Sequence, residues 1–336
     1  MRVTSRLKAL RNKARSPHSI PRFEGRESRS HHNVALWRLA AWASADSLRN
    51  RRRLTQIETF VQFAGFPRSG HSLIGSILDA HPHARISHEL DAMGLFEKGF
   101  PQSAIFALID RMALEFTRHG RYWNGHGYRV PGGAHDSADP LRVIGDKKGD
   151  AAVRWIARSP SLIDRLGRAG GPNKKWILVT RDPFDNIATM SLRHGRAYDT
   201  LRSSTRGHTD FHRALAQKQR EGVIASRVLD SQLDEYERLC RTVGAMKNRT
   251  RPADWLDVGH EQLTATPAAE IERIIGFLEL AVEPAYVERC AAMVYDKSHR
   301  TRDLIDWPDT AIERVEALCA TYSFLQPYQA QTPHEL

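Results

Sequence analysis

An apolar run that leads directly into a glycine-framed loop is the feature that most restricts what this chain can form. Within the stretch FVQFAGFPRSGHS, four residues separate Gly65 from Gly70. This is the spacing of a nucleotide-binding phosphate loop, and Ser72 occupies the hydroxyl position of that motif. His71 stands where the motif has its lysine, whereas a cation appears inside the loop at Arg68. The stretch therefore predicts a site for a phosphate-like anion without the lysine of common ATPases.

The basic charge of the chain is concentrated at its amino-terminal end. The 336 residues include 50 Lys and Arg and 39 Asp and Glu, and 41% are hydrophobic. The first 53 residues hold 14 of the basic and 3 of the acidic residues, so the remainder has equal numbers of each. We therefore expect a basic arm over residues 1–53, partly disordered or helical, and a single globular domain over residues 54–330. A neutral domain gives no reason to expect a specific nucleic-acid partner.

The basic arm has two interpretations. It is either a solvated tail or a segment that contacts an anionic surface, where each cation near a lipid adds about 1 kcal/mol. The apolar stretch 34–45 is shorter than the ~20 residues needed to cross a bilayer. Leu36, Leu39 and Trp42 fall at helical spacing, which favours a helix docked on the domain.

The cysteines bear on the compartment. Cys240, Cys290 and Cys319 are too few and too scattered for a disulfide framework or a zinc site. The Arg and Ser content of the arm is typical of an organelle transit segment, but Glu24 and Glu27 are not. We expect a cytoplasmic protein.

Strand and helix patterns alternate along the chain. Compact apolar runs predict strands over residues 60–65, 142–145, 175–180 and 255–259. Helical patterns are expected over 72–80, 101–117, 151–166, 184–193, 210–247, 268–280 and 309–322, and surface loops over 124–140 and 196–209. This alternation predicts an α/β fold with a central parallel sheet between two helical layers, a three-layer α/β/α arrangement. Ligands are then expected at the carboxyl ends of the strands.

The other strand ends carry further charged groups. Arg181 follows the strand 175–180, and Thr189 and Arg193 lie eight and twelve residues later, near one face of the next helix. These three side chains are suited to a second phosphate, although Arg193 alone is equally explained by a surface ion pair. Lys147 follows another strand end, where a lysine is commonly just solvated. Glu89 follows a short extended run, and a carboxylate beside an anion site suits a general base, although alone it reads as a surface residue.

Taken together, these segments resemble a known family. The segments that carry the resemblance are Pro67-Arg68-Ser69-Gly70-His71-Ser72-Leu73, Leu78-Asp79-Ala80-His81-Pro82, Gly145-Asp146-Lys147 and Arg181-Asp182-Pro183 through Ser191. They resemble the sulfotransferases that use 3′-phosphoadenosine 5′-phosphosulfate (PAPS), nearest to the bacterial and tyrosylprotein branch, which have a fold like that of P-loop NTPases. The resemblance covers residues 60–193. Beyond it, Val258 to Leu263 loosely resembles a later family strand that usually has tyrosine at the position of His260.

The resemblance implies a role for each residue. It implies that the 5′-phosphosulfate is held by Arg68 and by the loop amides of Ser69, Gly70, His71 and Ser72. It implies that the 3′-phosphate is held by Arg181, Thr189 and Arg193, with Ser191 as an alternative to Thr189. Glu89 would be the catalytic base and Lys147 would contact the bridging oxygen. The implied reaction is metal-independent sulfuryl transfer to a hydroxyl of a carbohydrate, a small molecule or a peptide tyrosine.

Some questions and alternatives stay open. His71 replaces the usual threonine of the family, and either its ring or only its backbone NH serves the anion; we favour the backbone. The segment 297–307 is expected to fold over the donor through Ser298, Arg300 and Arg302. A P-loop kinase with Asp146 as a metal ligand, and a non-catalytic nucleotide-binding protein, are the alternative functions. The sequence does not indicate the acceptor or the oligomeric state.

Overall fold

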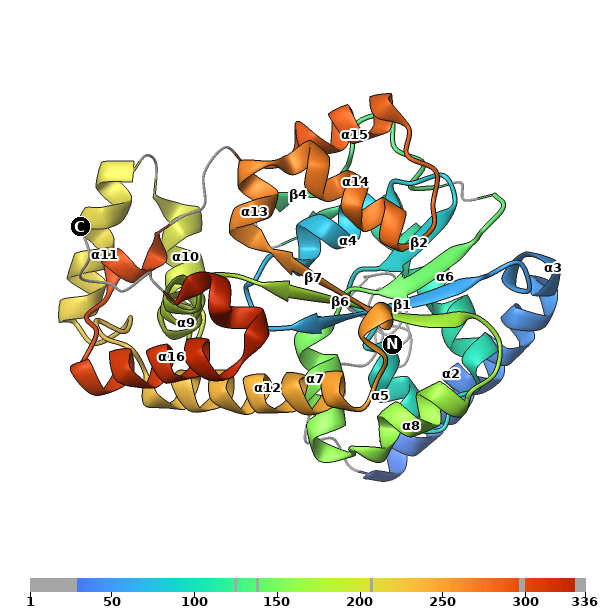
Figure 1. Ribbon diagram of the computed structural model, residues 1–336, viewed down its shortest axis with the longest axis horizontal. Coiled ribbons are helices and arrows are strands. Elements are labelled where there is room, and N and C mark those ends of the chain that lie inside the picture. Colours follow the sequence, from blue (N-terminus) through green and yellow to red (C-terminus); the bar gives the residue numbers. More distant parts are fainter. Residues whose placement is uncertain (1–28, 124–125, 137–138, 206–207, 296–299, 330–336) are drawn as a thin grey trace, which may run out of the picture.

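The computed structural model has a central sheet of five parallel strands in the order β2-β5-β1-β6-β7 (Figure 1). It describes residues 29–123, 126–136, 139–205, 208–295 and 300–329. The strands are β1 (Thr59–Gly65), β2 (Ala84–Ser87), β5 (Val143–Asp146), β6 (Asn173–Thr180) and β7 (Trp255–Gly259). A separate hairpin pairs β3 (Tyr122–Trp123) with β4 (His126–Gly127). The expected parallel sheet is confirmed, and β2 occupies the short extended run before Glu89.

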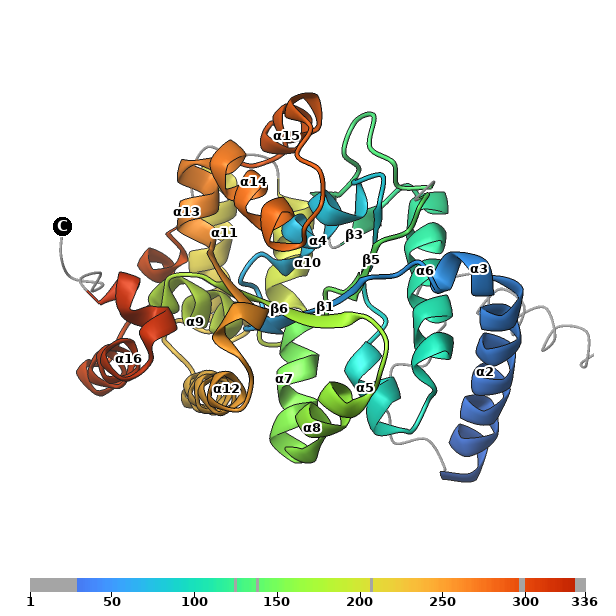
Figure 2. The same cartoon turned by 45° about the vertical axis from the view of Figure 1, so that its right-hand side comes forward.

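Helices cover both faces of the sheet, which makes three layers (Figures 1 and 2). Along β1 every residue is buried; Phe60 and Ala64 join the core on one face, and Val61 and Phe63 join the core on the other. Such a strand is mostly apolar because neither face meets water, and Thr59 and Gln62 are its buried polar residues. One face is covered by α4 (His71–Asp79), α13 (His260–Ala265), α14 (Pro267–Phe277) and α15 (Pro284–Ala291). Helices on the other face include α5 (Ala92–Glu97), α6 (Gln102–Arg118), α7 (Gly149–Arg158), α8 (Ser161–Arg168), α9 (Pro183–Leu192), α12 (Asp230–Asn248) and α16 (Asp309–Thr321).

Two helices expected to be continuous are interrupted. The pattern over 151–166 is divided between α7 and α8 at Pro160, which restricts the residue before it to non-helical conformations. The pattern over 210–247 is divided between α11 (His208–Arg220) and α12. Gly222 follows α11 with a φ of 69°, the left-handed conformation that commonly ends a helix.

The expected loop over 196–209 contains a helix, α10 (Ala197–Ser204). Its polar composition suggested a loop, but Tyr198 is buried and packs edge-on against Phe211 with ring centroids 5.6 Å apart. This tertiary contact outweighs the weak helical preference of the Ser and Thr residues. Short 3₁₀ helices complete the described chain: η1 (Pro252–Asp254), η2 (Thr301–Leu304) and η3 (Ser323–Tyr328).

Part of the basic arm is helical and packs on the domain. Helix α2 (Arg29–Arg49) and the short α3 (Arg51–Leu54) lie along α6 (Figure 2). Ala43 is fully buried there, and Arg53 donates to the Asp110 carboxylate at 2.5 Å. Among the described residues, no helix has the length and apolarity to span a bilayer. The division of the chain at residue 53 stays a prediction.

Candidate functional site

The loops that leave the carboxyl ends of the strands bring the charged residues to one edge of the sheet. In the strand register, Asp146 lies beside both Gln62 of β1 and Ser87 of β2, and Thr180 lies beside Gly259. Glu89, Lys147 and Arg181 therefore follow strands that end side by side. The geometry of a parallel sheet thus gathers residues that are far apart in the sequence.

The loop between β1 and α4 has the backbone of an anion-binding turn. Gly65, Arg68 and Gly70 have φ values of 134°, 69° and 107°. A Cβ on Gly70 would lie 2.9 Å from Cδ2 of His260, so only glycine fits without displacement. The Ser69 hydroxyl donates to the Phe66 carbonyl at 2.9 Å, which fixes the turn. Because α4 begins directly after Gly70, its unpaired NH groups and positive dipole end lie at this loop.

The ring of His71 is buried and bonded to the backbone of β1, so it does not face the anion site. Its Nε2 donates to the Ala64 carbonyl at 3.0 Å, and burial lowers the pKa of the imidazole. A Cβ on Gly149 would lie 2.6 Å from Nε2, so α7 approaches the ring closely. The ring therefore joins β1 to the start of α7, and the backbone NH is what His71 offers to the loop.

Lys147, Glu89 and Ser72 form a connected group beside the loop. The Lys147 ammonium lies 2.5 Å from Glu89 Oε1 and donates to the Ser72 hydroxyl at 3.0 Å. The ammonium group is nearly buried, whereas the Glu89 side chain is 27% exposed. Lys148 is less close, with its Nζ 4.0 Å from Glu89 Oε2. A cation, a carboxylate and the phosphate loop are thus within contact of one another.

Asp146 fixes the relative positions of Lys147 and Glu89. Its Oδ1 accepts from the Ser87 hydroxyl at 2.7 Å, and its Oδ2 accepts from the Ala92 NH at 2.8 Å. Burial raises the pKa of this carboxyl to about 6, against these hydrogen bonds, which favour its ionised form. Both oxygens are engaged with the chain, so Asp146 is not placed as the metal ligand that a kinase would need.

Arg181 is held at the start of α9 by two hydroxyl groups. Its Nη1 donates to Thr189 Oγ1 at 3.1 Å, and its Nη2 donates to Thr301 Oγ1 at 3.1 Å. Thr189 in turn donates to the Asp185 carbonyl at 2.7 Å. Thr301 was not identified from the sequence, because only the folded chain brings η2 to α9.

Arg193 and Arg68 are close enough to repel each other. Arg193 forms an ion pair with Asp199 at 2.9 Å. Burial lowers the pKa of the Arg193 guanidinium, and the positive charge of Arg68 lowers it further. Two arginines that approach each other in this way favour the binding of an anion between them. The charge of Arg68, at the first expected anion site, therefore acts on Arg193 at the second.

Tyr128 joins this group from the segment after β4. Burial raises the pKa of its phenol, and the nearby Ser72 side chain lowers it. The positive charges of Arg193 and Arg68 lower it in turn, so both arginines are near the phenol. A tyrosine in a Gly- and Pro-rich segment carried no sequence signal for this position.

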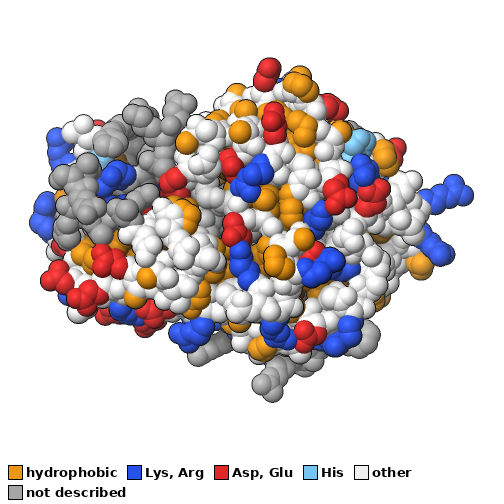
Figure 3. Space-filling view, in the orientation of Figure 1, with side chains coloured by type: hydrophobic (Ala, Val, Ile, Leu, Met, Phe, Trp, Pro, Cys, Tyr) orange, Lys and Arg blue, Asp and Glu red, His pale blue; other side chains and the backbone are white. Residues whose placement is uncertain are grey.

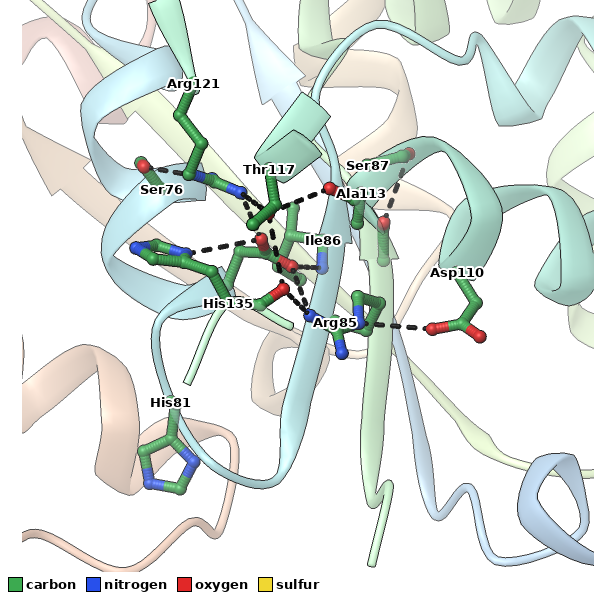
Figure 4. A network of polar contacts seen from close by, with 12 residues as sticks. Ser76, His81, Arg85, Ile86, Ser87, Asp110, Ala113, Thr117, Arg121 and His135 are labelled. Atoms are coloured by element: carbon green, nitrogen blue, oxygen red, sulfur yellow. Dashed lines mark hydrogen bonds and ion pairs between the residues drawn. The ribbon is translucent and has the colours of Figure 1, made fainter. Parts of the chain in front are cut away.

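Figure 4 shows a buried network of polar contacts that includes Arg85 and Arg121, and Arg121 also binds the backbone of Tyr128. The Tyr128 carbonyl accepts from Arg121 Nε at 3.0 Å and from the Ser76 hydroxyl. Arg121 forms an ion pair with Asp79 at 2.6 Å, and the other Asp79 oxygen accepts from the Ile86 NH at 2.7 Å. Asp79 therefore connects α4, β2 and the segment that carries Tyr128.

Comparison with known protein families agrees with the resemblance found in the sequence. A model of the sulfotransferase family matches residues 61–284, more than half of the chain, including Arg68, Glu89, Lys147, Arg181 and Arg193. The chain belongs to the sulfotransferase family. The resemblance seen in residues 60–193 is confirmed at the level of the family. No curated protein matches the sequence.

Solved sulfotransferase structures are similar to this chain at low sequence identity. The sulfotransferase domain of the Synechococcus PCC 7002 olefin synthase is 15% identical, with 79% of this chain and 94% of that one covered and a TM-score of 0.43. A sulfotransferase from Alicyclobacillus acidocaldarius is 15% identical, with 81% and 95% covered and a TM-score of 0.40. Sulfotransferase STF9 from Mycobacterium avium is 11% identical, with 83% and 79% covered and a TM-score of 0.45.

Ser191 does not lie where Thr189 lies in this sulfotransferase. It is fully buried, and its hydroxyl accepts from the Leu229 NH at 3.2 Å, next to the start of α12. The two residues are half a helical turn apart, so they face different neighbours. The contacts therefore favour Thr189 for this position, and the alternative of Ser191 stays a prediction.

The segment before α16, which was expected to fold over the donor, is bound to the start of α9 by Arg302. Arg302 forms buried ion pairs with Asp182 and, at 2.9 Å, with Asp185, both at the start of α9. Arg300 is exposed and pairs with Asp303 at 3.1 Å. Arg302 is thus a structural residue, and Thr301 is the one that contacts Arg181. Ser298 lies outside the described residues.

The shape of the phosphate loop leads to a prediction about stability. We expect Gly70→Ala to lower the free energy of unfolding by about 1–3 kcal/mol, since alanine would be strained at a φ of 107° and would press on His260. Gly276→Ala in α14 is the control, because nothing lies within 4 Å of its added Cβ. Chemical denaturation of both variants tests this. Equal stability of the two variants would contradict the described loop.

Proposed function

We propose that this sulfotransferase moves a sulfuryl group from PAPS to a hydroxyl of its acceptor, with Glu89 as the general base. The observation that carries the proposal is the contact of Lys147 with both Glu89 and Ser72. It puts a proton acceptor and a cation beside the loop that is built for a phosphate-like anion. The base, the cation and the phosphate loop are all needed around the sulfur atom that is transferred.

The residues fit a donor with anionic groups at both ends. Arg68 and the loop amides of Ser69 to Ser72 are proposed to hold the 5′-phosphosulfate. Arg181, Thr189 and Arg193 are proposed to hold the 3′-phosphate, a group that ATP lacks. The closeness of Arg68 and Arg193 supports this assignment, because the repulsion between them is relieved when an anion binds.

The proposed step is an in-line displacement at sulfur. A bond forms between the acceptor oxygen and sulfur while the bond from sulfur to the 5′-phosphate oxygen breaks, and Glu89 takes the proton of the acceptor hydroxyl. Negative charge then grows on the departing oxygen, where Lys147 and Arg68 are proposed to stabilise it. By analogy with phosphoryl transfer, positioning and electrostatics supply most of the rate. We propose no metal ion, and the engagement of both Asp146 oxygens supports this.

Aromatic side chains beside Glu89 shape the acceptor side of the site. His88 stacks on Phe116 with centroids 4.1 Å apart and meets Trp123 edge-on at 5.5 Å. The pKa of His88 is well below its usual value because of burial and the charge of Lys147, so its ring is neutral. We propose that Lys147, and not His88, is the cation that stabilises the departing oxygen, and that His88 serves as packing. The acceptor is a carbohydrate, a small molecule or a peptide tyrosine.

The assignment of the 3′-phosphate predicts a selective loss of affinity. We expect Arg181→Ala to weaken the binding of adenosine 3′,5′-bisphosphate by about 10- to 100-fold, the effect of one charge-assisted hydrogen bond. The affinity for adenosine 5′-phosphate should change little, because that ligand has no 3′-phosphate. Isothermal titration calorimetry measures both constants, and Arg300→Ala is the control from the neighbouring surface. Equal losses for the two ligands would contradict the assignment.

Transfer of labelled sulfate tests the proposed reaction as a whole. The protein is incubated with ³⁵S-labelled PAPS and a panel of phenols, tyrosine peptides and carbohydrates, and labelled products are separated. Labelling of at least one acceptor class, which is lost in Glu89→Gln, supports the proposal. Binding of the nucleotide without transfer to any of them would favour the non-catalytic alternative.

A further inference from the structure

Between Arg38 and Arg49, the outer side of α2 exposes apolar side chains. Residues 38, 41, 42, 45, 48 and 49 are exposed, and their spacing puts them on one side of the helix. Trp42 and Leu48 are 39% and 72% exposed, although most large apolar side chains of the chain are buried. Arg38 and Arg49 flank them. The opposite side, with Ala43 and Ser47, packs toward α6.

The positive charge continues into α3. Arg51 and Arg52 are exposed, whereas Arg53 is paired with Asp110. Lys and Arg side chains project at the rim of the molecule where α3 lies (Figure 3). We call Arg38, Trp42, Leu48, Arg49, Arg51 and Arg52 the α2–α3 face. The sequence before it adds eight basic and two acidic residues in positions 1–28.

A hollow opens on the same edge of the molecule. Its volume is about 690 Å³, and its lining includes Leu48, Arg51, Leu54, Ile57, Phe106 and Pro172. The volume is in the range of ligand sites, roughly 300–1,000 Å³. The lining also includes polar residues, among them Gln102 and Glu58, and Glu58 is paired with Arg142. Leu48 and Arg51 belong to both the hollow and the α2–α3 face.

We propose that the α2–α3 face docks on an anionic membrane surface. Trp42 and Leu48 enter the headgroup region, and the arginines contact lipid phosphates, since basic residues near an anionic membrane surface are attracted to it. Trp is suited to this boundary because its ring is apolar and its NH is polar. The apolar centre favours a membrane over a nucleic acid, since nucleic-acid interfaces are more polar and more uniformly basic.

Docking in this way leaves the site accessible. β1 begins just after α3 and ends at the phosphate loop, and its seven residues span about 20 Å at ~3.3 Å per residue. The α2–α3 face and the proposed catalytic residues are therefore at opposite ends of the sheet. A docked protein presents its site away from the bilayer, toward acceptors in solution. The proposal does not depend on the chemistry of that site.

Vesicle co-sedimentation with the full chain tests the proposal. We expect binding to vesicles of phosphatidylglycerol and phosphatidylcholine, and little binding to phosphatidylcholine alone. The variant Trp42→Ser with Leu48→Ser should bind the anionic vesicles at least tenfold more weakly, and so should Arg49→Glu with Arg52→Glu. Arg213→Glu with Arg220→Glu on α11 is the control with the same charge change, and it should bind close to the wild-type level. Thermal unfolding confirms that each variant is folded.

Three outcomes would overturn the proposal. Wild-type protein that does not bind anionic vesicles has no such surface. Unchanged binding of the Trp42 and Leu48 variant would mean that charge alone attracts the chain and that the apolar residues do not enter the membrane. Binding to RNA that the arginine variant loses, without any binding to vesicles, would assign the face to nucleic acid.

Discussion

Replacing Lys147 with alanine is expected to lower turnover by about 10²- to 10³-fold, the usual effect of losing one group that stabilises developing charge. The side chain contacts both the phosphate loop at Ser72 and the carboxylate of Glu89. It is therefore a cation in contact with both the donor loop and the proposed base. Steady-state transfer of sulfate from saturating PAPS measures the effect on kcat.

Lys148→Ala is the matched control for this change. Lys148 is the next residue and has the same charge, but its Nζ is 4.0 Å from Glu89 and its side chain is more exposed. We expect its turnover to stay within about threefold of the wild type, since exposed ion pairs contribute little. Equal losses in the two variants would mean that general positive charge, and not the position of Lys147, supports the reaction.

Glu89→Gln is expected to slow the chemical step by about 10²- to 10⁴-fold, the range for the loss of a general base. Glutamine keeps the size of the side chain and its contact with Lys147, but it accepts no proton. The affinity for adenosine 3′,5′-bisphosphate should therefore stay near the wild-type value. Single-turnover kinetics separates the chemical step from binding.

The double variant Lys147→Ala with Glu89→Gln refines this result. Because the two side chains are in contact, their effects should combine to less than the product of the single losses. A loss of nucleotide affinity as large as the loss of turnover in Glu89→Gln would show instead that Glu89 supports the structure of the site.

The phosphate loop and the strand ends were predictable because their signals are local. Gly65, Gly70 and Ser72 carry the loop within eight residues, and Arg181 and Lys147 directly follow apolar runs. A parallel sheet aligns such strand ends without any further information. The fold class therefore followed from the order of strands and helices alone.

The neighbours of each site residue were not predictable, because they depend on contacts between distant segments. Thr301 reaches Arg181 across 120 positions of sequence. Arg302 was expected to contact the donor because of its charge, but it is paired with two carboxylates at the start of α9. The sequence left Ser191 open as an alternative to Thr189, and only the fold shows that Thr189 accepts from Arg181 whereas Ser191 accepts from the Leu229 NH.

The role of Asp146 was also not predictable from the sequence, because it depends on neighbours from other segments. A carboxylate after a strand is equally suited to a metal ion and to a structural hydrogen bond. Only the positions of Ser87 and Ala92 show that both of its oxygens are used. Tyr128 is the converse example, since a buried network that includes Arg121 brings an unremarked residue to the phosphate loop.

The most direct test of the account is the preference of the site among adenine nucleotides. Isothermal titration calorimetry compares adenosine 3′,5′-bisphosphate in the presence of EDTA with adenosine 5′-phosphate and with Mg-ATP. The account predicts that the bisphosphate binds most tightly, by at least about tenfold over adenosine 5′-phosphate, and without a metal ion. Tighter binding of Mg-ATP, or no gain from the 3′-phosphate, would contradict it.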